Sequence, residues 1–175
     1  GPGRMRQYYT LIYLFLFSMY LAVLANHPLV TWIAIETTTL STALLISMYN
    51  KPAAMEAAWK YLIINSVGLL VGLFGTVLYL ALGAEKLGNE MITWQNLTQG
   101  AILLNPEILK IAFIFVVVGY GTKMGLAPMH TWLPDAHGRA PVPISSLLSG
   151  VLLNVSLYAI LRYKVIGDAS FGSAY

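Results

Sequence analysis

The sequence of 175 residues contains no cysteine and very little charge. Without cysteine, the chain has no disulfides, thiolate metal sites or cysteine-ligated iron–sulfur clusters of its own. Charged residues make up 10% of the sequence and hydrophobic residues 58%, and the mean hydropathy is +0.70. Because a soluble domain has about 25% charged residues, this composition indicates an integral membrane protein.

The formal net charge of +3 does not indicate nucleic-acid binding, since the basic residues lie near the ends of apolar runs. Basic residues in that position typically fix the orientation of membrane helices. The two groups are Arg4, Arg6, Lys51 and Arg139 on one side, and Lys86, Arg162 and Lys164 on the other. This distribution predicts a cytoplasmic N-terminus. We find no secretory signal peptide and no Gly-rich nucleotide-binding fingerprint.

Long apolar runs predict an all-α membrane protein with about five transmembrane helices, because roughly 20 apolar residues span a bilayer. Residues 1–175 are expected to form a single transmembrane unit. The expected helices are 8–26, 29–49, 57–83, 107–126 followed by a half-helix at 129–136, and 144–161. Pro128 and Pro134 are expected to break the fourth helix, because proline lacks a backbone N–H and clashes with the preceding turn. A short interfacial helix is expected near residues 91–97.

Two of these helices carry stripes of small and polar residues. The stripe on the third helix consists of Asn65, Gly68, Gly72, Gly75 and Tyr79. Its alternating spacing of four and three indicates a face that packs against another helix. The stripe on the fifth helix consists of Ser146, Gly150, Asn154 and Tyr158. This second stripe fits either a water path or packing against neighbouring helices.

Three ionisable residues, Glu36, Lys60 and Lys123, lie within the apolar runs. A charge at the bilayer centre costs about 2.5–3.5 kcal/mol on insertion scales, so such residues usually serve transport or pair with an opposite charge. In a Glu–Lys pair, a proton that arrives or leaves decides whether the pair holds, which makes the pair a proton relay. The alternative for Glu36 and Lys123 is a static buried pair. The alternative for Lys60 is a topological anchor that reaches the membrane surface.

Residues 123–150, KMGLAPMHTWLPDAHGRAPVPISSLLSG, resemble the proton-antiporter motif of the antiporter-like subunits of respiratory complex I. Related subunits occur in multisubunit sodium/proton antiporters and in membrane-bound hydrogenases. The segments LAPMHTWLPDAH and LLSGVLLNVSLYAILRYK are most similar to the hydrogenase-associated branch. Because members of this family are much longer, the resemblance implies that the chain is an internal fragment of such a subunit.

The resemblance also implies which residues form the relay. It matches Glu36 to the family's glutamate in its fifth transmembrane helix and Lys123 to the lysine of its broken seventh helix. In the family these two residues form an alternating ion pair. Lys60 matches a lysine often found at the start of the sixth helix.

Asn154 departs from the family pattern, because proton-pumping relatives often carry lysine there. An amide cannot hold a proton at neutral pH, so the resemblance implies a relay through water or through His130 or His137. The alternative for these histidines is hydrogen bonding that closes the broken helix. They lie seven residues apart with Pro134 between them and no third ligand adjacent, so a metal site is not expected. Asp135 is expected to cap the following turn.

These features predict a proton-translocating subunit of a complex I-like NADH dehydrogenase or membrane-bound hydrogenase. The redox chemistry and its cofactors are expected in partner subunits, and this chain is expected to hold no catalytic centre, cofactor or metal. The expected partners are other membrane subunits and the lipid bilayer, in a prokaryotic plasma membrane, and not nucleic acid. Two alternatives remain: a subunit of a stand-alone multisubunit sodium/proton antiporter, and a fragment that only packs.

Overall fold

The computed structural model describes residues 1–88, 92–125 and 151–172. Within these residues the chain forms six α-helices and one short 3-10 helix, and no strand. In chain order they are α1 (Pro2–Leu24), α2 (Pro28–Ser47), α3 (Pro52–Leu87), α4 (Trp94–Gln99), η2 (Ala101–Leu103), α5 (Pro106–Met124) and α8 (Leu153–Phe171). The expected all-α class is confirmed.

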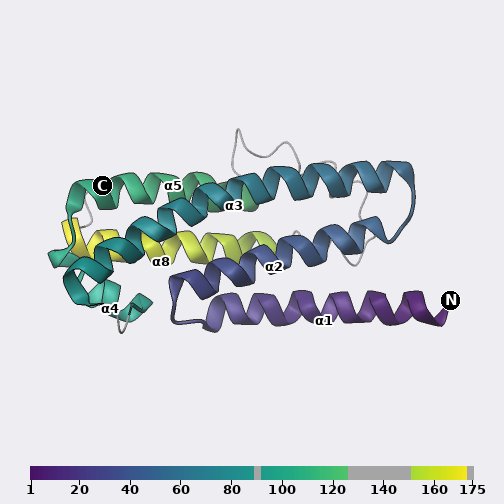
Figure 1. Ribbon diagram of the computed structural model, residues 1–175, viewed down its shortest axis with the longest axis horizontal. Helices are drawn as coiled ribbons and strands as arrows, with labels where there is room; N and C mark the ends of the chain where they lie inside the picture. The colour runs from purple at the N-terminus through teal and green to yellow at the C-terminus, as the bar shows by residue number, and fades with distance from the viewer. Residues whose placement is uncertain (89–91, 126–150, 173–175) are drawn as a thin grey trace.

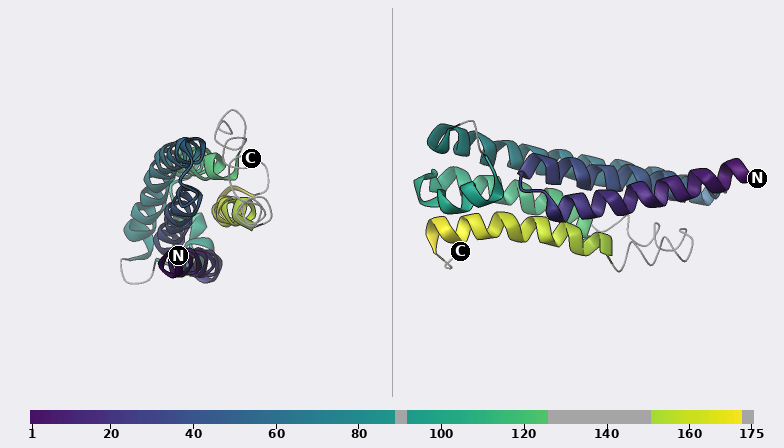
Figure 2. Two further views of the ribbon diagram at one scale, coloured as in Figure 1. Left: turned by 90° about the vertical axis from the view of Figure 1, so that its right-hand side faces the viewer. Right: turned by 90° about the horizontal axis from the view of Figure 1, so that it is seen from below.

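The five long helices lie side by side, with their axes along the length of the molecule (Figure 1). Helix α3 packs against α5 and α2, α1 packs against α2, and α8 packs against α5. Seen end-on in Figure 2, α1, α2 and α3 form a row, with α8 to one side of it. The short elements α4 and η2 lie at one end of the bundle, opposite the N-terminus, where both contact α8.

Proline opens four of the long helices. These starts are Pro2, Pro28, Pro52 and Pro106. Proline suits the first turn, because the N–H there has no partner within the helix and the φ angle of proline is already helical. Two starts are also capped: Nδ1 of His27 accepts from the N–H of Leu29 at 3.1 Å, and Oδ1 of Asn105 accepts from the N–H of Glu107 at 3.0 Å. In the described part of the chain, every proline therefore stands at a helix start.

Helices α1 and α3 are longer than the sequence predicts. Helix α1 begins at Pro2 rather than at residue 8, so Arg4 and Arg6 lie within it. Helix α3 begins at Pro52 rather than near residue 57 and continues to Leu87 rather than ending at residue 83. In both cases the helix begins at the nearest proline, because charged and polar residues at the membrane surface do not stop a helix.

Helix α8 continues to Phe171, ten residues beyond the predicted end at Leu161. Arg162 and Lys164 do not end it, because both bond along the helix. Nε of Arg162 donates to the hydroxyl of Tyr158 at 2.7 Å, and Nζ of Lys164 lies 2.7 Å from Oδ2 of Asp168. Pairs spaced four residues apart support a helix, so the charges that were expected to stop α8 stabilise its second half.

Helix α5 ends at Met124, two residues before the predicted end. Gly125 adopts the left-handed region with φ of 82°, and its N–H bonds back to the last turn of the helix. Glycine reaches this conformation without steric cost, which is why it commonly ends helices. The expected break at Pro128 and Pro134, and the half-helix at 129–136, lie outside the described residues.

Helices α1, α2 and α3 are long and apolar enough to cross a membrane, by length and composition. Helices α5 and α8 are each 19 residues long but carry three charged residues apiece. Large hydrophobic side chains are exposed along the outer faces of the helices, among them Tyr13, Phe17 and Tyr20 on α1. Apolar surface of this extent matches a lipid environment. The chain is an all-helical integral membrane segment.

The small-residue stripe of α3 packs against α5, as its spacing predicts. All five residues of this stripe are buried. Gly119 of α5 lies so close to Gly72 that a β-carbon on Gly119 would overlap the Gly72 backbone. A β-carbon on Gly68 would lie 2.7 Å from Cβ of Thr122. The two backbones therefore approach closely at the end of α5 that carries Lys123.

Candidate proton-relay site

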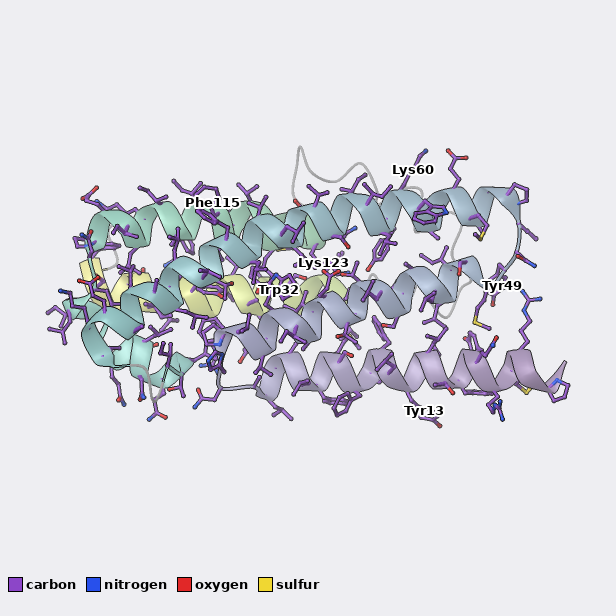
Figure 3. All side chains as sticks on the ribbon, in the orientation of Figure 1. Tyr13, Trp32, Tyr49, Lys60, Phe115 and Lys123 are labelled. Atoms are coloured by element: carbon purple, nitrogen blue, oxygen red, sulfur yellow. The ribbon has the colours of Figure 1, made fainter. Side chains whose placement is uncertain are left out.

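Lys123 lies in the interior of the bundle with none of its side chain exposed (Figure 3). Its ammonium group donates to Oγ1 of Thr39 on α2 at 2.6 Å and to the phenolic oxygen of Tyr61 on α3. Nζ also lies 4.6 Å from the centroid of the Tyr61 ring, within the range in which the face of an aromatic ring attracts a cation. Three helices thus contribute to one buried ammonium site.

The hydroxyls around Lys123 are oriented by the backbone of α2. Oγ1 of Thr39 donates to the carbonyl of Ile35 at 3.3 Å, and Oγ1 of Thr42 donates to that of Thr38 at 2.7 Å. A threonine hydroxyl has one proton and two lone pairs. Because the proton of Thr39 is used on a carbonyl, its oxygen faces Lys123 as an acceptor.

Glu36 lies on α2 three residues before Thr39, so the two side chains share one side of the helix. Its Oε1 accepts a hydrogen bond from Oγ of Ser66 on α3 at 3.1 Å. Its Oε2 is buried and has no hydrogen-bond partner within the described ranges. A buried carboxylate oxygen without a partner indicates a site for water, a proton or a cation.

No salt bridge joins Glu36 to Lys123 in the part of the chain that the structure describes. The ion pairs found there are Lys60–Glu56, Lys86–Glu85, Lys110–Glu107 and Lys164–Asp168. In this arrangement Lys123 is bound by hydroxyls and Glu36 by a serine. The alternating Glu36–Lys123 pair stays a prediction.

Lys60 lies on the outside of α3, away from the Lys123 site (Figure 3). Its ammonium group is 2.9 Å from Oε1 of Glu56, one turn earlier, and both side chains are about half exposed or more. Exposed pairs of this kind contribute only about 0.3–0.5 kcal/mol. An exposed pair near the start of α3 is compatible with the anchoring alternative, and the relay role of Lys60 stays a prediction.

Asn154 is exposed on α8, one turn before Tyr158. The hydroxyl of Tyr158 donates to the carbonyl of Val23 on α1 at 2.9 Å and accepts from Arg162. This part of the stripe on α8 therefore contacts α1. The remaining candidates lie outside the described residues: His130, His137, Asp135, Ser146 and Gly150.

The sequence prediction missed Tyr61, Thr39 and Ser66. Tyr61 precedes Asn65 by four residues, so it extends the small-residue stripe of α3 by one turn. Thr39 follows Glu36 by three residues in a run of threonines. The spacings therefore could have identified Tyr61 and Thr39 from the sequence. Nothing in the local sequence indicates a role for Ser66.

Residues 25–173 match the family described as NADH:quinone oxidoreductase/Mrp antiporter, TM. The chain belongs to this family. One relative is the hydrogenase-4 component F homolog of Methylacidiphilum infernorum, which is 44% identical over 172 residues, 97% of this chain and 36% of the relative. Another is NAD(P)H-quinone oxidoreductase chain 4 2 of Thermosynechococcus vestitus, 32% identical over 164 residues, 91% of this chain and 29% of the relative. The higher identity to the hydrogenase-4 homolog agrees with the branch that the motif indicates.

Two solved structures share the fold. A chain of the membrane-bound sulfane sulfur reductase, an archaeal respiratory membrane complex, superposes with a TM-score of 0.83 at 23% identity, over 93% of this chain and 32% of that one. A chain of respiratory complex I from Thermus thermophilus gives 0.69 at 20% identity, over 94% and 43%. The 175-residue chain spans about a third of the length of the two curated relatives.

Proposed function

We propose that this chain is the part of a proton-translocating subunit that holds its first buried relay, in a complex I-like NADH dehydrogenase or a membrane-bound hydrogenase. Redox chemistry in partner subunits drives proton transfer through Glu36 and Lys123. Helices α5 and α8 are the further membrane spans, in the plasma membrane of a prokaryote. The observation that carries the proposal is the fully buried Lys123, bound by the neutral hydroxyls of Thr39 and Tyr61.

The site suits a lysine that changes its protonation state. A hydroxyl both accepts and donates, so Tyr61 is able to accept from the ammonium form of Lys123 and to donate to the neutral amine. The site therefore holds the side chain in either state. A permanent carboxylate partner would favour only the charged form. With Glu36 near but bound to Ser66, the pair forms and separates as protons arrive and leave.

The similarity to a hydrogenase-4 component homolog and to a quinone oxidoreductase chain supports membrane partners of the respiratory type. On this reading Lys123 exchanges protons with the rest of the full-length subunit. The resemblance of residues 123–150 to the antiporter motif assigns that exchange to His130, His137 and water at Asn154. Lys60 anchors α3 at the membrane surface.

The second candidate function is a subunit of a stand-alone sodium/proton antiporter, and the family description itself, which includes the Mrp antiporter, favours it. Purification of the full-length subunit from its native membrane separates the two functions. Co-purifying subunits with iron–sulfur centres support the redox-driven pump. A preparation without redox centres that exchanges sodium for protons supports the antiporter.

The proposal is tested by Lys123→Ala in the intact complex, reconstituted into lipid vesicles. Alanine cannot carry a proton, so the number of protons moved per electron should fall sharply while the subunit content stays normal. Lys110→Ala is the matched control, because Lys110 lies on the same helix and pairs with Glu107 at the surface. A Lys123→Ala complex that pumps as well as the control would overturn the proposal.

A further inference from the structure

A second group of buried hydroxyls lies toward the α4 end of the bundle. Thr76 of α3, Tyr120 of α5 and Tyr163 of α8 meet there, and all three are fully buried. Oγ1 of Thr76 and the hydroxyl of Tyr163 are 2.6 Å apart, and the ring of Tyr120 lies 6.1 Å from that of Tyr163, measured between centroids. The hydroxyl of Tyr120 is buried and has no hydrogen-bond partner among the described residues. We call these three residues the hydroxyl cluster. A membrane interior disfavours unneeded polar groups, so their convergence from three helices calls for an explanation.

Aromatic packing fixes the position of the cluster. The ring of Tyr163 lies 4.6 Å from that of Tyr79 and 4.7 Å from that of Trp94 in α4, measured between centroids. Nε1 of Trp94 in turn donates to Oγ1 of Thr31 at 3.2 Å. The cluster is therefore joined to the end of the bundle where α4 lies.

Two further buried polar atoms lie along the helices between the cluster and the Lys123 site. Helix α8 runs from the middle of the bundle to the end where α4 lies (Figure 1). Ser156 precedes Tyr163 by seven residues, so it shares the same face of α8 and lies about two turns nearer the start of that helix. Asn65 lies on the α3 stripe between Tyr61 and Thr76. Oγ of Ser156 and Oδ1 of Asn65 are buried and have no hydrogen-bond partner among the residues that the structure describes. Buried polar atoms without a protein partner are usually satisfied by water.

We propose that Asn65, Ser156 and the hydroxyl cluster line a water-filled proton path from Lys123 to the α4 end of the bundle. The juxtaposition of the unpartnered buried oxygens of Asn65, Ser156 and Tyr120 with the hydrogen-bonded hydroxyls of the cluster carries the inference. It rests on the proposed function, in which Lys123 gains and loses a proton, and adds the route by which that proton reaches one face of the membrane.

The transfer balances at every step. The ammonium group of Lys123 gives its proton to a water oxygen and becomes a neutral amine. Each following water or hydroxyl oxygen accepts a proton on a lone pair and releases its own proton to the next oxygen, so after the N–H bond of Lys123 only O–H bonds form and break. Oδ1 of Asn65 has no proton to release and only accepts a hydrogen bond from the water beside it. The last proton enters the water at the α4 end. No electron is transferred within the path.

The competing explanation is that the hydroxyls only tie α3 to α8. Tyr163→Phe separates the two explanations, because it keeps the ring packing against Tyr79 and Trp94 and removes only the oxygen. Ser156→Ala removes an oxygen that makes no bond to the described part of the protein, so it has little structural effect. Thr76→Val removes the hydrogen bond between Thr76 and Tyr163 from the α3 side with almost no change of volume. This variant replaces Tyr163→Phe in the experiment if Tyr163→Phe lowers the yield of the complex.

The experiment measures proton uptake by vesicles that contain the intact complex with its full-length subunit, together with redox turnover and subunit content. We expect Tyr163→Phe and Ser156→Ala each to lower the protons moved per electron about tenfold or more, since positioned proton-transfer groups contribute at least that much. Tyr158→Phe and Ser18→Ala are the matched controls. The hydroxyl of Tyr158 bonds to the carbonyl of Val23, and that of Ser18 to the carbonyl of Leu14 at 2.7 Å. Both controls should pump normally.

The path and the proposed function fail in different ways. Normal pumping by Tyr163→Phe and Ser156→Ala, with Lys123→Ala inactive, would overturn the path and leave the function of Lys123 in place. Normal pumping by Lys123→Ala would overturn the proposed function, and with it the source of the proton that the path carries.

Discussion

Gly119 of α5 and Gly72 of α3 pack backbone against backbone, and this contact sets the distance between the helices that carry Lys123 and Tyr61. Gly75 extends the contact, because a β-carbon there would lie 2.8 Å from the carbonyl oxygen of Ala112. Lys123 reaches a hydroxyl on α3 because the glycines let the two helices approach closely. The glycine stripe is thus a structural precondition of the relay site.

Gly119→Ala should therefore prevent correct packing of α3 on α5. The new methyl group would meet backbone atoms, which cannot move aside as a flexible side chain can. Overpacking of a core costs about 1–3 kcal/mol, and we expect the upper end of that range. Gly3→Ala is the control, since a β-carbon there meets nothing within 4 Å. Thermal unfolding of the full-length subunit in detergent checks this, and equal midpoints for the two variants would contradict the packing described here.

Tyr61→Phe tests the hydroxyl that binds Lys123 directly. The substitution keeps the ring beside the ammonium group and removes the oxygen, and a hydrogen bond to a charged group contributes about 1.5–3 kcal/mol. We expect proton uptake to slow markedly while redox turnover and subunit content remain near normal. Tyr13→Phe is the control, because Tyr13 is 68% exposed on α1. If both variants pump at the same rate, the Tyr61 hydroxyl has no part in the relay.

Glu36→Gln tests the acidic partner. Glutamine keeps the shape of the side chain and its ability to accept a hydrogen bond from Ser66, but it cannot hold a negative charge or exchange a proton at neutral pH. We expect the complex to assemble and its pumping to be lost. Glu56→Gln removes the same charge from an exposed pair on α3 and should have no effect on pumping. Equal pumping by the two variants would mean that Glu36 is a static residue.

Much of this architecture follows from local sequence. The prolines of the described residues stand at helix starts, because the geometry of proline fits the first helical turn. The four-three spacing of Asn65, Gly68 and Gly72 predicts the packing face of α3. The energetic cost of a lysine in an apolar run singles out Lys123, and the structure places it at full burial.

The partners of Lys123 do not follow from local sequence. Glu36 and Thr39 share one side of α2, so the rotation of α2 against α5 decides which of them meets the ammonium group. That rotation depends on contacts across the whole bundle. The length of α8 was mispredicted for a related reason, since Arg162 and Lys164 find partners along their own helix that a hydropathy pattern does not reveal.

Lys60→Arg distinguishes anchoring from proton transfer at the start of α3. Arginine keeps the charge and is able to pair with Glu56, but it does not release its proton at neutral pH. Because Lys60 is paired at the surface, we expect full pumping from the Arg variant. Loss of pumping in the vesicle assay, with normal subunit content, would show that Lys60 takes part in proton transfer.

Lys123→Arg is the most direct test of the central claim, that the buried lysine functions by gaining and losing a proton. Arginine keeps the positive charge and supplies donors for Thr39 and Tyr61. If Lys123 served only as a structural cation, arginine would therefore substitute for it and pumping would continue. It does not deprotonate in proteins, so a relay would stop. The measurement is protons taken up per electron by vesicles that contain the intact complex. The account predicts that Lys123→Arg, like Lys123→Ala, assembles and does not pump. Pumping at the unmodified rate by Lys123→Arg would contradict it.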